Sequence, residues 1–525
     1  MRLQDEAIFF ERARKGAALF VLFFLAIFVF APLGRLLRET EEVIAGILDP
    51  QVLSAIRVSL FQAVVSSTLS VVGGLILTLL LTRARTYEKF ASLLWSIPFS
   101  IPTLVAVYFW LQIIFFLNEF GFSARPSLFW IITAHVAFNI PFAALLLTQA
   151  RMKISETELE AARTLGAGRW VLWKSFIFSQ MRPAFFIALL QIYMMCMMSF
   201  ALVLLLGGGP PNETLELGIY KALRAGQLDM DRAVAFALLQ MILIAIPGAF
   251  IMPHLLKKSF SWSQAKRILP IEGEKRHGKI FGMLLIFISA LLSLPYLFTS
   301  LSGIRYFFSE SEFLFRELLR PTLISIGLST ATMVVSLTLA TLSVFALQQR
   351  SKINQWVMTW GALPGAISPL TLGLGLWLLT SDFFDPFLGQ PVFIVLLMSL
   401  QFLPLALRWL WEADQRDTKN LYGTARVLGA NPFQAFWVSK WISWRSSLLW
   451  TGALIFSASF GELAAVSLFY SESLVPLSLQ MSRWMGRYAF WKADAAAAMM
   501  ILFSLAGLIA ASRLAKSQPW GWRRG

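Results

Sequence analysis

The sequence predicts an all-α polytopic membrane protein, with about twelve transmembrane helices in two homologous six-helix halves. Three observations support this fold class. The chain of 525 residues is 57% hydrophobic and only 14% charged. Its apolar residues form continuous runs long enough to cross the hydrocarbon core of a bilayer, which takes about 20 helical residues. A short motif also recurs far downstream in the chain, which indicates an internal duplication.

Helices rather than strands are expected in these runs, because backbone groups in lipid must be paired within the spanning segment. A β-barrel would need alternating segments of about ten residues. In the first half, residues 1–256, the expected spans are 16–34, 58–82, 91–117, 127–150, 184–206 and 231–256. In the second half, residues 280–525, they are 280–301, 321–347, 354–380, 391–411, 447–469 and 493–513. The charged segment 257–279 is expected to be a cytoplasmic linker.

The formal net charge of +16 suits either nucleic acid or an anionic membrane surface. Most of the 45 Lys and Arg residues fall in loops on one side of the twelve-span arrangement. Cytoplasmic loops of membrane proteins carry such an excess of basic residues. We therefore expect both termini in the cytoplasm, the lipid bilayer as the surroundings of the chain, and no nucleic-acid partner.

The recurring motif lies in two loops, 151–183 and 412–446, which hold equivalent places in the two halves. The first copy runs from Glu160 to Ala167 and the second from Gly423 to Ala430, an offset of 263 residues. Pro141 matches Pro404 at the same offset, and Ser199-Phe200 is echoed by Ser459-Phe460. Alanine favours helix and glycine ends it. Each loop is expected to hold a short docking helix that closes on a glycine turn; its candidate residues are Glu160, Ala161, Ala162, Gly166, Ala425 and Gly429.

Glu160-Ala161-Ala162, three residues and then Gly166 resemble the signature loop, or EAA motif, of ABC importer permeases. The resemblance implies that the two loops couple the chain to two copies of an ATPase subunit. It also implies a periplasmic solute-binding protein as a partner and a location in the bacterial inner membrane. The chain departs from the family pattern at Gly423, where the acid belongs, and at Pro183, where the proline after the glycine comes late.

Two fused halves of six spans resemble the branch of the family that includes the thiamine and ferric-ion permeases. The run Leu206–Pro210 and the segment Thr214–Leu223 resemble the thiamine permeases more. This resemblance implies import of thiamine or its phosphates, with ferric ion as the alternative. Composition and spacing do not point to either substrate.

The sequence gives no sign of an enzyme. It has no phosphate-binding loop of the form Gly-x-x-x-x-Gly-Lys-Ser/Thr, so ATP and Mg²⁺ are expected on the partner ATPase subunits and no cofactor on this chain. The histidines, His135, His254 and His277, lie far apart in sequence, which argues against a metal site. The single cysteine, Cys196, lies in an apolar span and is expected to be a buried structural thiol.

Polar residues inside the apolar spans are the candidates for a translocation path. Glu462 is the foremost, because a carboxylate at membrane depth is costly and usually faces a cavity or a partner. Asn139 and Gln191 are further candidates, although amides often only join helices. The alternative for Glu462 is a position at the end of its span, near the interface. A secondary transporter driven by an ion gradient is the rival class of function, and it would need more intramembrane acids than the sequence offers.

Overall fold

The computed structural model describes residues 2–38, 49–152, 154, 156–207, 209, 212–224, 229–257, 278–347, 352–381, 390–415 and 419–515. The regular elements of these residues are helices, apart from an isolated bridge between Ser471 and Leu474. This confirms the expected all-α fold. Residues 258–277 of the expected linker lie outside the described residues.

The first half of the chain contains the helices α1 to α13. Their bounds are α1 Arg2–Leu25, α2 Ala31–Arg38, α4 Pro50–Arg83, α5 Glu88–Ser100, α6 Thr103–Glu119, α7 Leu128–Met152, α8 Glu156–Thr164, α9 Arg169–Val171, α10 Ser179–Met197, α11 Ala201–Leu206, α12 Leu215–Arg224 and α13 Met230–Lys257. Single π-helical turns, Ala26–Phe30 and Leu172–Phe178, join α1 to α2 and α9 to α10.

The second half contains the helices α14 to α26. Their bounds are α14 Gly278–Ser293, α15 Pro295–Ile304, α16 Tyr306–Ser309, α17 Ser311–Phe313, α18 Leu319–Leu347, α19 Lys352–Ala362, α20 Pro369–Thr380, α21 Gln390–Asp414, α22 Lys419–Val427, α23 Pro432–Phe460, α24 Ala464–Phe469, α25 Leu477–Gly486 and α26 Phe490–Ala515. A 3-10 turn, Leu363–Ala366, follows α19.

Among the described residues, eight helical stretches are long and apolar enough to cross a membrane, and three bent helix pairs bring the number to eleven. The remaining expected span, 447–469, lies on α23 and α24. These helices accommodate the roughly twelve spans that the sequence predicts.

Two of the expected spans, 91–117 and 354–380, are each divided by a sharp bend. The chain bends by 94° between α5 and α6, and by 104° between α19 with its 3-10 turn and α20. A residue that precedes proline is pushed out of helical conformation. Ile101, before Pro102, and Ser368, before Pro369, are indeed extended, with ψ angles of 136° and 141°. Pro102 and Pro369 therefore divide each of these spans into two helices.

The helix ends show the duplication in its true register. The motif helices α8 and α22 begin and end 263 residues apart, and so do the gaps between α10 and α11 and between α23 and α24. This register pairs Ser199 with Glu462. The pairing of Ser199-Phe200 with Ser459-Phe460 that was predicted from the sequence was wrong. Ser459-Phe460 are identical to the first pair, but they lie three residues before the true equivalents, Glu462-Leu463.

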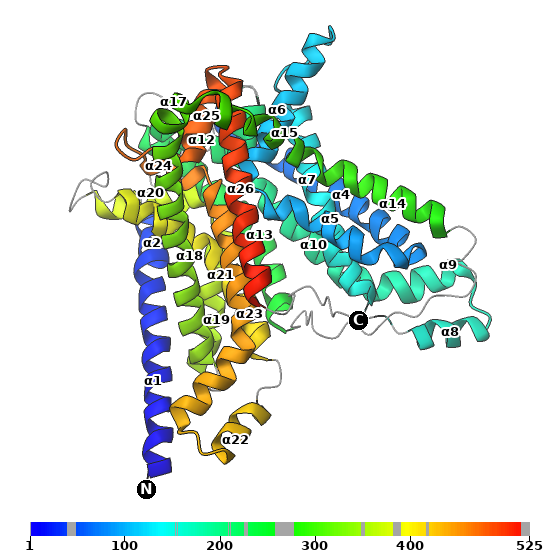
Figure 1. The fold of residues 1–525 in the computed structure, drawn as a ribbon, viewed down its shortest axis with the longest axis vertical. Coiled ribbons are helices and arrows are strands. Elements are labelled where there is room, and N and C mark those ends of the chain that lie inside the picture. Colours follow the sequence, from blue (N-terminus) through cyan, green and yellow to red (C-terminus); the bar gives the residue numbers. More distant parts are fainter. Residues whose placement is uncertain are drawn as a thin grey trace.

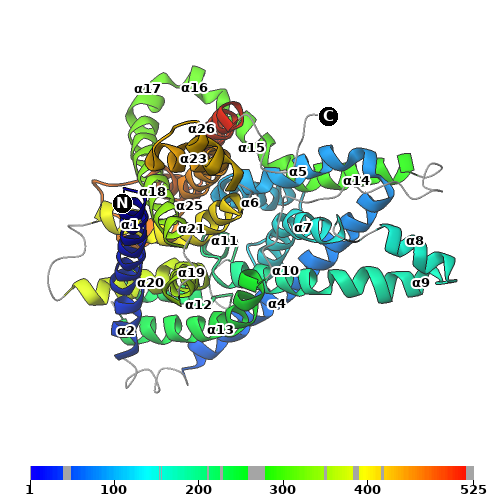
Figure 2. The same ribbon diagram turned by 90° about the horizontal axis from the view of Figure 1, so that it is seen from below.

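The two halves exchange their first helices. Within each half the equivalent helices pack together, α4 on α7 and α18 on α21. By contrast, α1 and α2 of the first half pack on α18, α19 and α20, while α14 of the second half packs on α4, α5 and α7. Figures 1 and 2 show both helices lying along the opposite half. On α5, the Trp95 indole N–H donates to the Ser289 hydroxyl of α14 over 2.9 Å, so even the polar contacts cross between the halves.

The short helices α12 and α25 are attached in the same way in each half. The backbone N–H of Leu215, at the start of α12, donates to the Ser59 hydroxyl of α4 over 2.9 Å. In the second half the Leu477 N–H donates to the Ser325 hydroxyl of α18 over 2.8 Å. Each bond satisfies a backbone donor at a helix start that has no partner within the helix. In Figure 1, α12 and α25 lie at the upper end of the molecule, and α8, α22 and the start of α1 lie in its lower part.

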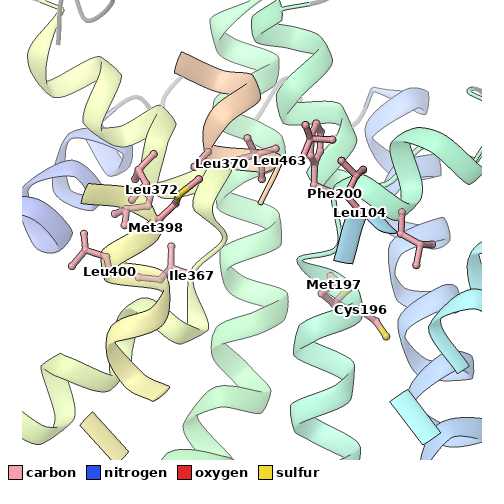
Figure 3. Close-up of a cluster of buried hydrophobic side chains, with 14 of the residues drawn as sticks. Leu104, Cys196, Met197, Phe200, Ile367, Leu370, Leu372, Met398, Leu400 and Leu463 are labelled. Carbon is pink, nitrogen blue, oxygen red and sulfur yellow. The ribbon is translucent and has the colours of Figure 1, made fainter. Parts of the chain in front are cut away.

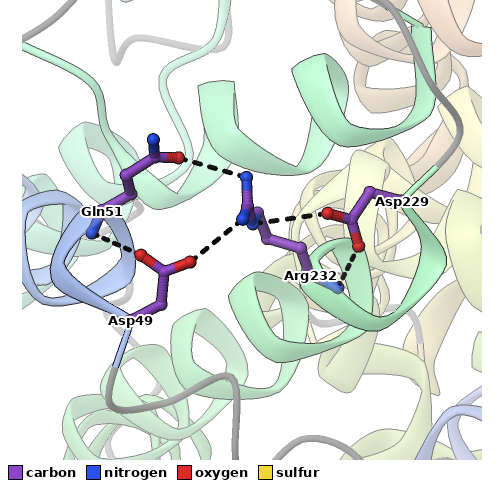
Figure 4. Close-up of polar contacts among 4 residues, drawn as sticks. All are labelled: Asp49, Gln51, Asp229 and Arg232. Carbon is purple, nitrogen blue, oxygen red and sulfur yellow. Dashed lines mark hydrogen bonds and ion pairs between the residues drawn. The ribbon is translucent and has the colours of Figure 1, made fainter.

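A polar cluster joins the starts of α4 and α13 (Figure 4). Asp49 caps α4 by accepting the Gln51 N–H over 2.8 Å. Arg232 of α13 donates to the second Asp49 oxygen over 3.0 Å and lies 3.4 Å from the Asp229 carboxylate. Because these side chains are partly exposed, the cluster adds little to stability, but it sets the position of α13 against α4.

Close packing of α4 on α7 depends on Gly74. A Cβ added there would lie 2.4 Å from the Ala143 Cβ and 2.7 Å from the Ala144 nitrogen. Small residues are what allow membrane helices to approach so closely. On α18, the equivalent helix of the second half, Gly327 has nothing within 4 Å of such a Cβ.

We therefore predict that Gly74→Ala destabilises the protein by about 1–3 kcal/mol, the usual effect of overpacking. Gly327→Ala is the matched control and should leave stability unchanged or raise it by up to about 1 kcal/mol, since alanine is the better helix former. Thermal unfolding of the purified proteins in detergent measures both. Equal unfolding midpoints would contradict the packing described here.

Candidate functional site

Each motif loop folds into a short helix that ends in the same hydrogen-bonded turn. In the first loop, α8 ends where the Gly166 N–H donates to the Arg163 carbonyl and the Ala167 N–H to the Ala162 carbonyl. The second loop repeats both bonds 263 residues later, from Gly429 to Arg426 and from Ala430 to Ala425. This pair of bonds is the Schellman motif, which places a left-handed residue after the helix. Gly166 and Gly429 have φ angles of 85° and 88°, so glycine suits both positions.

The two turns present apolar side chains to the surroundings. Leu165 and its equivalent Leu428 are 87% and 81% exposed, although both are large and apolar. Of the predicted coupling residues, Glu160 and Ala161 are exposed, whereas Ala162 is buried and faces the rest of the loop. Both loops lie in the same part of the molecule as the start of α1 (Figure 1). Exposed apolar residues beside a polar helix are typical of a docking surface for another protein.

A cavity of about 560 Å³ lies between the two halves. It is lined from the first half by α6, α7, α10, α11 and α13, and from the second by α19, α20, α21, α23 and α24. Four interruptions of helices meet at its wall: those before α6, α11, α20 and α24. At one of them Gly461 lies against Pro102 of the other half, so closely that a Cβ on Gly461 would be 2.3 Å from the Pro102 Cβ. The cavity is therefore bounded by non-helical backbone from both halves.

Buried apolar side chains surround these interruptions (Figure 3). Phe200 and Leu463, which are equivalent residues in the repeat, belong to the same cluster and both line the cavity. Cys196 is buried as a free thiol in this cluster, and its structural role remains a prediction. The apolar packing excludes water from the short stretches of chain between the helices.

Glu462 lies in the interruption before α24 and lines the cavity. Its two carboxylate oxygens accept the backbone N–H groups of Ala464 and Ala465 over 2.8 and 3.0 Å. The backbone N–H groups of Leu463 and Val466 also lie near this carboxylate. The side chain is half-buried. Ser199, the equivalent residue of the first half, also lines the cavity. Of this equivalent pair, only the residue of the second half carries a charge.

Asn139 and Gln191 line the same cavity, as do His135, Gln401 and Arg408. The structure thus brings the three predicted path residues, Glu462, Asn139 and Gln191, to a single cavity. Their participation in translocation stays a prediction.

Sequence reasoning missed Glu216. Glu216 lies near the start of α12 and is fully buried. One carboxylate oxygen accepts the Ser368 hydroxyl of the other half over 2.7 Å, and the other accepts the Gln240 amide of α13. Thr371 then donates to Gln240 over 3.1 Å. The isolated polar residues Gln240 and Ser368 in apolar spans were the available signal, because buried polar groups need partners.

Among the described residues, no group of three or more His, Cys, Asp and Glu side chains is placed to hold a metal ion.

Comparison with known proteins agrees with this architecture. Residues 70–260 match the family model described as "Binding-protein-dependent transport system inner membrane component". The "Thiamine transport system permease protein ThiP" of Haemophilus influenzae is 29% identical over 507 residues, which cover 89% of this chain and 89% of that protein. The protein of the same name from Escherichia coli is 28% identical over 485 residues, 88% of each chain. The "Sulfate transport system permease protein CysT" of Escherichia coli is 26% identical over 230 residues, which cover 41% of this chain and 83% of that protein.

The fold, the duplicated glycine turns and these matches make the chain similar to ABC importer permeases, which are multi-pass proteins of the inner membrane. Permeases of this class work with separate ATPase subunits and a solute-binding protein. Among its relatives, the two thiamine transport permeases span almost the full length of the chain and so include both of its halves.

The geometry of the two turns gives a direct prediction. Gly166→Ala and Gly429→Ala should each reduce the amount of ATPase subunit that co-purifies with the permease, because a side chain in left-handed conformation costs about 1 kcal/mol or more. The added Cβ meets nothing within 4 Å in either turn, so the effect is conformational and not steric. Asparagine tolerates this conformation better, and the Asn variants should retain more ATPase than the Ala variants.

Gly168→Ala and Gly423→Ala serve as controls in the same two loops, since neither glycine has a positive φ or a neighbour within 4 Å of an added Cβ. If the Ala variants at Gly166 and Gly429 bind the ATPase as well as these controls do, the turns are not docking elements.

Proposed function

We propose that the chain is the permease subunit of a thiamine importer and forms the translocation path for a thiamine molecule delivered by a periplasmic binding protein. The observation that carries the proposal is the similarity of nearly the whole chain to thiamine transport permeases. The site is compatible with this substrate. Thiamine carries a permanent positive charge on its thiazolium ring, and Glu462 offers a negative charge in the cavity.

The size and lining of the cavity support an organic cation. Its volume of about 560 Å³ falls within the range of about 300–1,000 Å³ that is typical of small-molecule sites. Trp110, Phe138, Phe200 and Phe402 line it, and aromatic faces attract cations. Arg408 also lines the cavity. Its positive charge suits a phosphate group, so the proposed substrates include the phosphates of thiamine.

The proposed mechanism assigns a different partner to each end of the molecule. Two copies of an ATPase subunit dock on the exposed turns of α8 and α22, and the ATP and Mg²⁺ are bound there and not by this chain. The solute-binding protein docks at the opposite end, beside α12 and α25. Closure of the ATPase pair shifts the permease between two states with different access to the cavity. The coupling requires that each partner binds one of these states more tightly than the other.

Thiamine uptake by cells whose other thiamine transporters have been deleted tests this function. We expect uptake to require the permease, its ATPase and its binding protein together, and to persist when the ion gradients are dissipated while ATP is maintained. Competition by ferric ion, or dependence on an ion gradient, would favour the alternative importer or a secondary transporter and would contradict the proposal.

Glu462→Gln should raise the KM for thiamine about tenfold or more, since two opposite unit charges about 4 Å apart attract by about 4 kcal/mol at an effective dielectric constant of about 20. It removes the negative charge and keeps a similar side-chain volume. Glu310→Gln is the control, because it removes an acid at an exposed position outside the cavity. Wild-type transport by the Glu462 variant would assign Glu462 to capping of α24 alone.

Topology can be tested separately. The basic loops predict that α8, α22 and both termini are cytoplasmic. Reporter fusions after Thr164 and after Val427 should therefore both give cytoplasmic signals. A periplasmic signal from either fusion would overturn the proposed orientation.

A further inference from the structure

The two short helices α12 and α25 each begin inside the protein and end near its surface. Glu216 and Ser478, the second residues of these helices, are buried. At the opposite ends, Arg224 of α12 is partly exposed and Arg487, which follows α25, is exposed. Both helices lie at the upper end of the molecule, away from the motif helices α8 and α22 (Figure 1). Each of them therefore joins that surface to the interior.

The start of α25 is hydrogen-bonded to the break before α24. The Ser478 hydroxyl donates to the backbone carbonyl of Glu462 over 2.8 Å. Glu462 lies in this break and lines the cavity. Backbone that leaves a helix within a membrane protein needs partners from the protein itself, and Ser478 supplies one. The second residue of α25 thus holds the backbone of an acid in the cavity wall.

The start of α12 is hydrogen-bonded to a break in the other half. Glu216 accepts the Ser368 hydroxyl over 2.7 Å, and Ser368 in turn caps α20. The other Glu216 oxygen accepts the Gln240 amide, whose own oxygen accepts the Thr371 hydroxyl over 3.1 Å. Together with the first turn of α20, these bonds close a ring. The second residue of α12 is thus joined to the break before α20, where Pro369 lines the cavity.

The two contacts are equivalent in place although they differ in chemistry. In each half, a short helix sets its second residue against a break that borders the cavity. Glu216, Ser368 and Ser478 are no more than 1% exposed, so water does not replace their bonds. A buried hydrogen bond is costly to break when a polar group is left unpaired. A shift of α12 or α25 therefore carries the bonded break with it, and a partner that displaces these helices also displaces the cavity wall.

We propose that Glu216 and Ser478 are positioning residues that transmit docking of the solute-binding protein to the cavity. The binding protein contacts the upper ends of α12 and α25 and favours one of the two states of the permease. The two contacts then move the breaks that carry Pro369 and Glu462. Hydrogen-bonded networks between packed helices can carry such coupling. The inference rests on the proposed function, because it takes the binding protein to dock beside α12 and α25.

The experiment measures ATP hydrolysis by the complete importer in lipid nanodiscs, with and without saturating thiamine-loaded binding protein. The binding protein should stimulate hydrolysis by the wild type. Ser478→Ala removes the donor to Glu462, and Glu216→Gln leaves one acceptor oxygen where two are used. Each change should reduce the stimulation about fivefold or more, the lower end of usual allosteric coupling. Basal hydrolysis and the amount of co-purified ATPase should stay at the wild-type level.

Ser482→Ala and Glu213→Gln are the matched controls. The Ser482 hydroxyl donates to the Leu479 carbonyl within α25, and Glu213, just before α12, pairs with Lys221 in the same half. Neither of these contacts reaches a break at the cavity. Both control variants should keep the full stimulation.

Thiamine uptake by the same complexes in proteoliposomes separates the two proposals. A wild-type importer that carries no thiamine would overturn the proposed function. In an importer that carries thiamine, three results would overturn this inference alone: an unstimulated wild type, full stimulation in both link variants, or an equal fall in basal and stimulated hydrolysis. If Glu216→Gln does not assemble, Ser478→Ala decides, because it removes only a hydroxyl group.

Discussion

The structure depends on one constraint: backbone that leaves a helix inside the bilayer must find its hydrogen-bond partners within the protein. Four breaks in the spanning helices, two in each half, meet at the cavity. There Ser368 caps α20, Glu462 caps α24, and the Ser457 hydroxyl donates to the Ser100 carbonyl of the other half over 2.6 Å. The site therefore lies where the chain can be irregular only because both halves enclose it.

The exchange of first helices bears on how the halves can move. Helix α1 lies on the second half and α14 on the first, so a rigid body that includes α4 and α7 also includes a helix from the other half of the sequence. The buried Glu216 links α12 and α13 to Ser368 at the break before α20. If one body moves against the other, the hydrogen bonds of Glu216 to Ser368 and Gln240 beside the cavity must therefore be carried along or rearranged.

Much of this could be predicted from the sequence, because lipid imposes simple rules on helix length and charge. The spans, the duplication, the glycine turns and the candidate Glu462 follow from such local patterns. The bends at Pro102 and Pro369 could have been placed from the effect of proline on the preceding residue. For the burial of Glu216 the isolated Gln240 and Ser368 were a signal, but they do not name their partner, since that depends on how α12 folds against the other half of the chain. The exchange of α1 and α14 leaves no local trace in composition.

Fusion of the two halves has a consequence for symmetry at Glu462. In an assembly of two identical half-length chains, any residue near the axis occurs twice, and a carboxylate there would face its own copy. Two like charges in one apolar site disfavour ionisation of both. A single chain escapes this restriction, because its equivalent positions evolve independently: here one carries Glu462 and the other the uncharged Ser199. The covalent link therefore permits Glu462 to line the cavity without a symmetry-related carboxylate opposite it, and with it a bound molecule that has two chemically different ends.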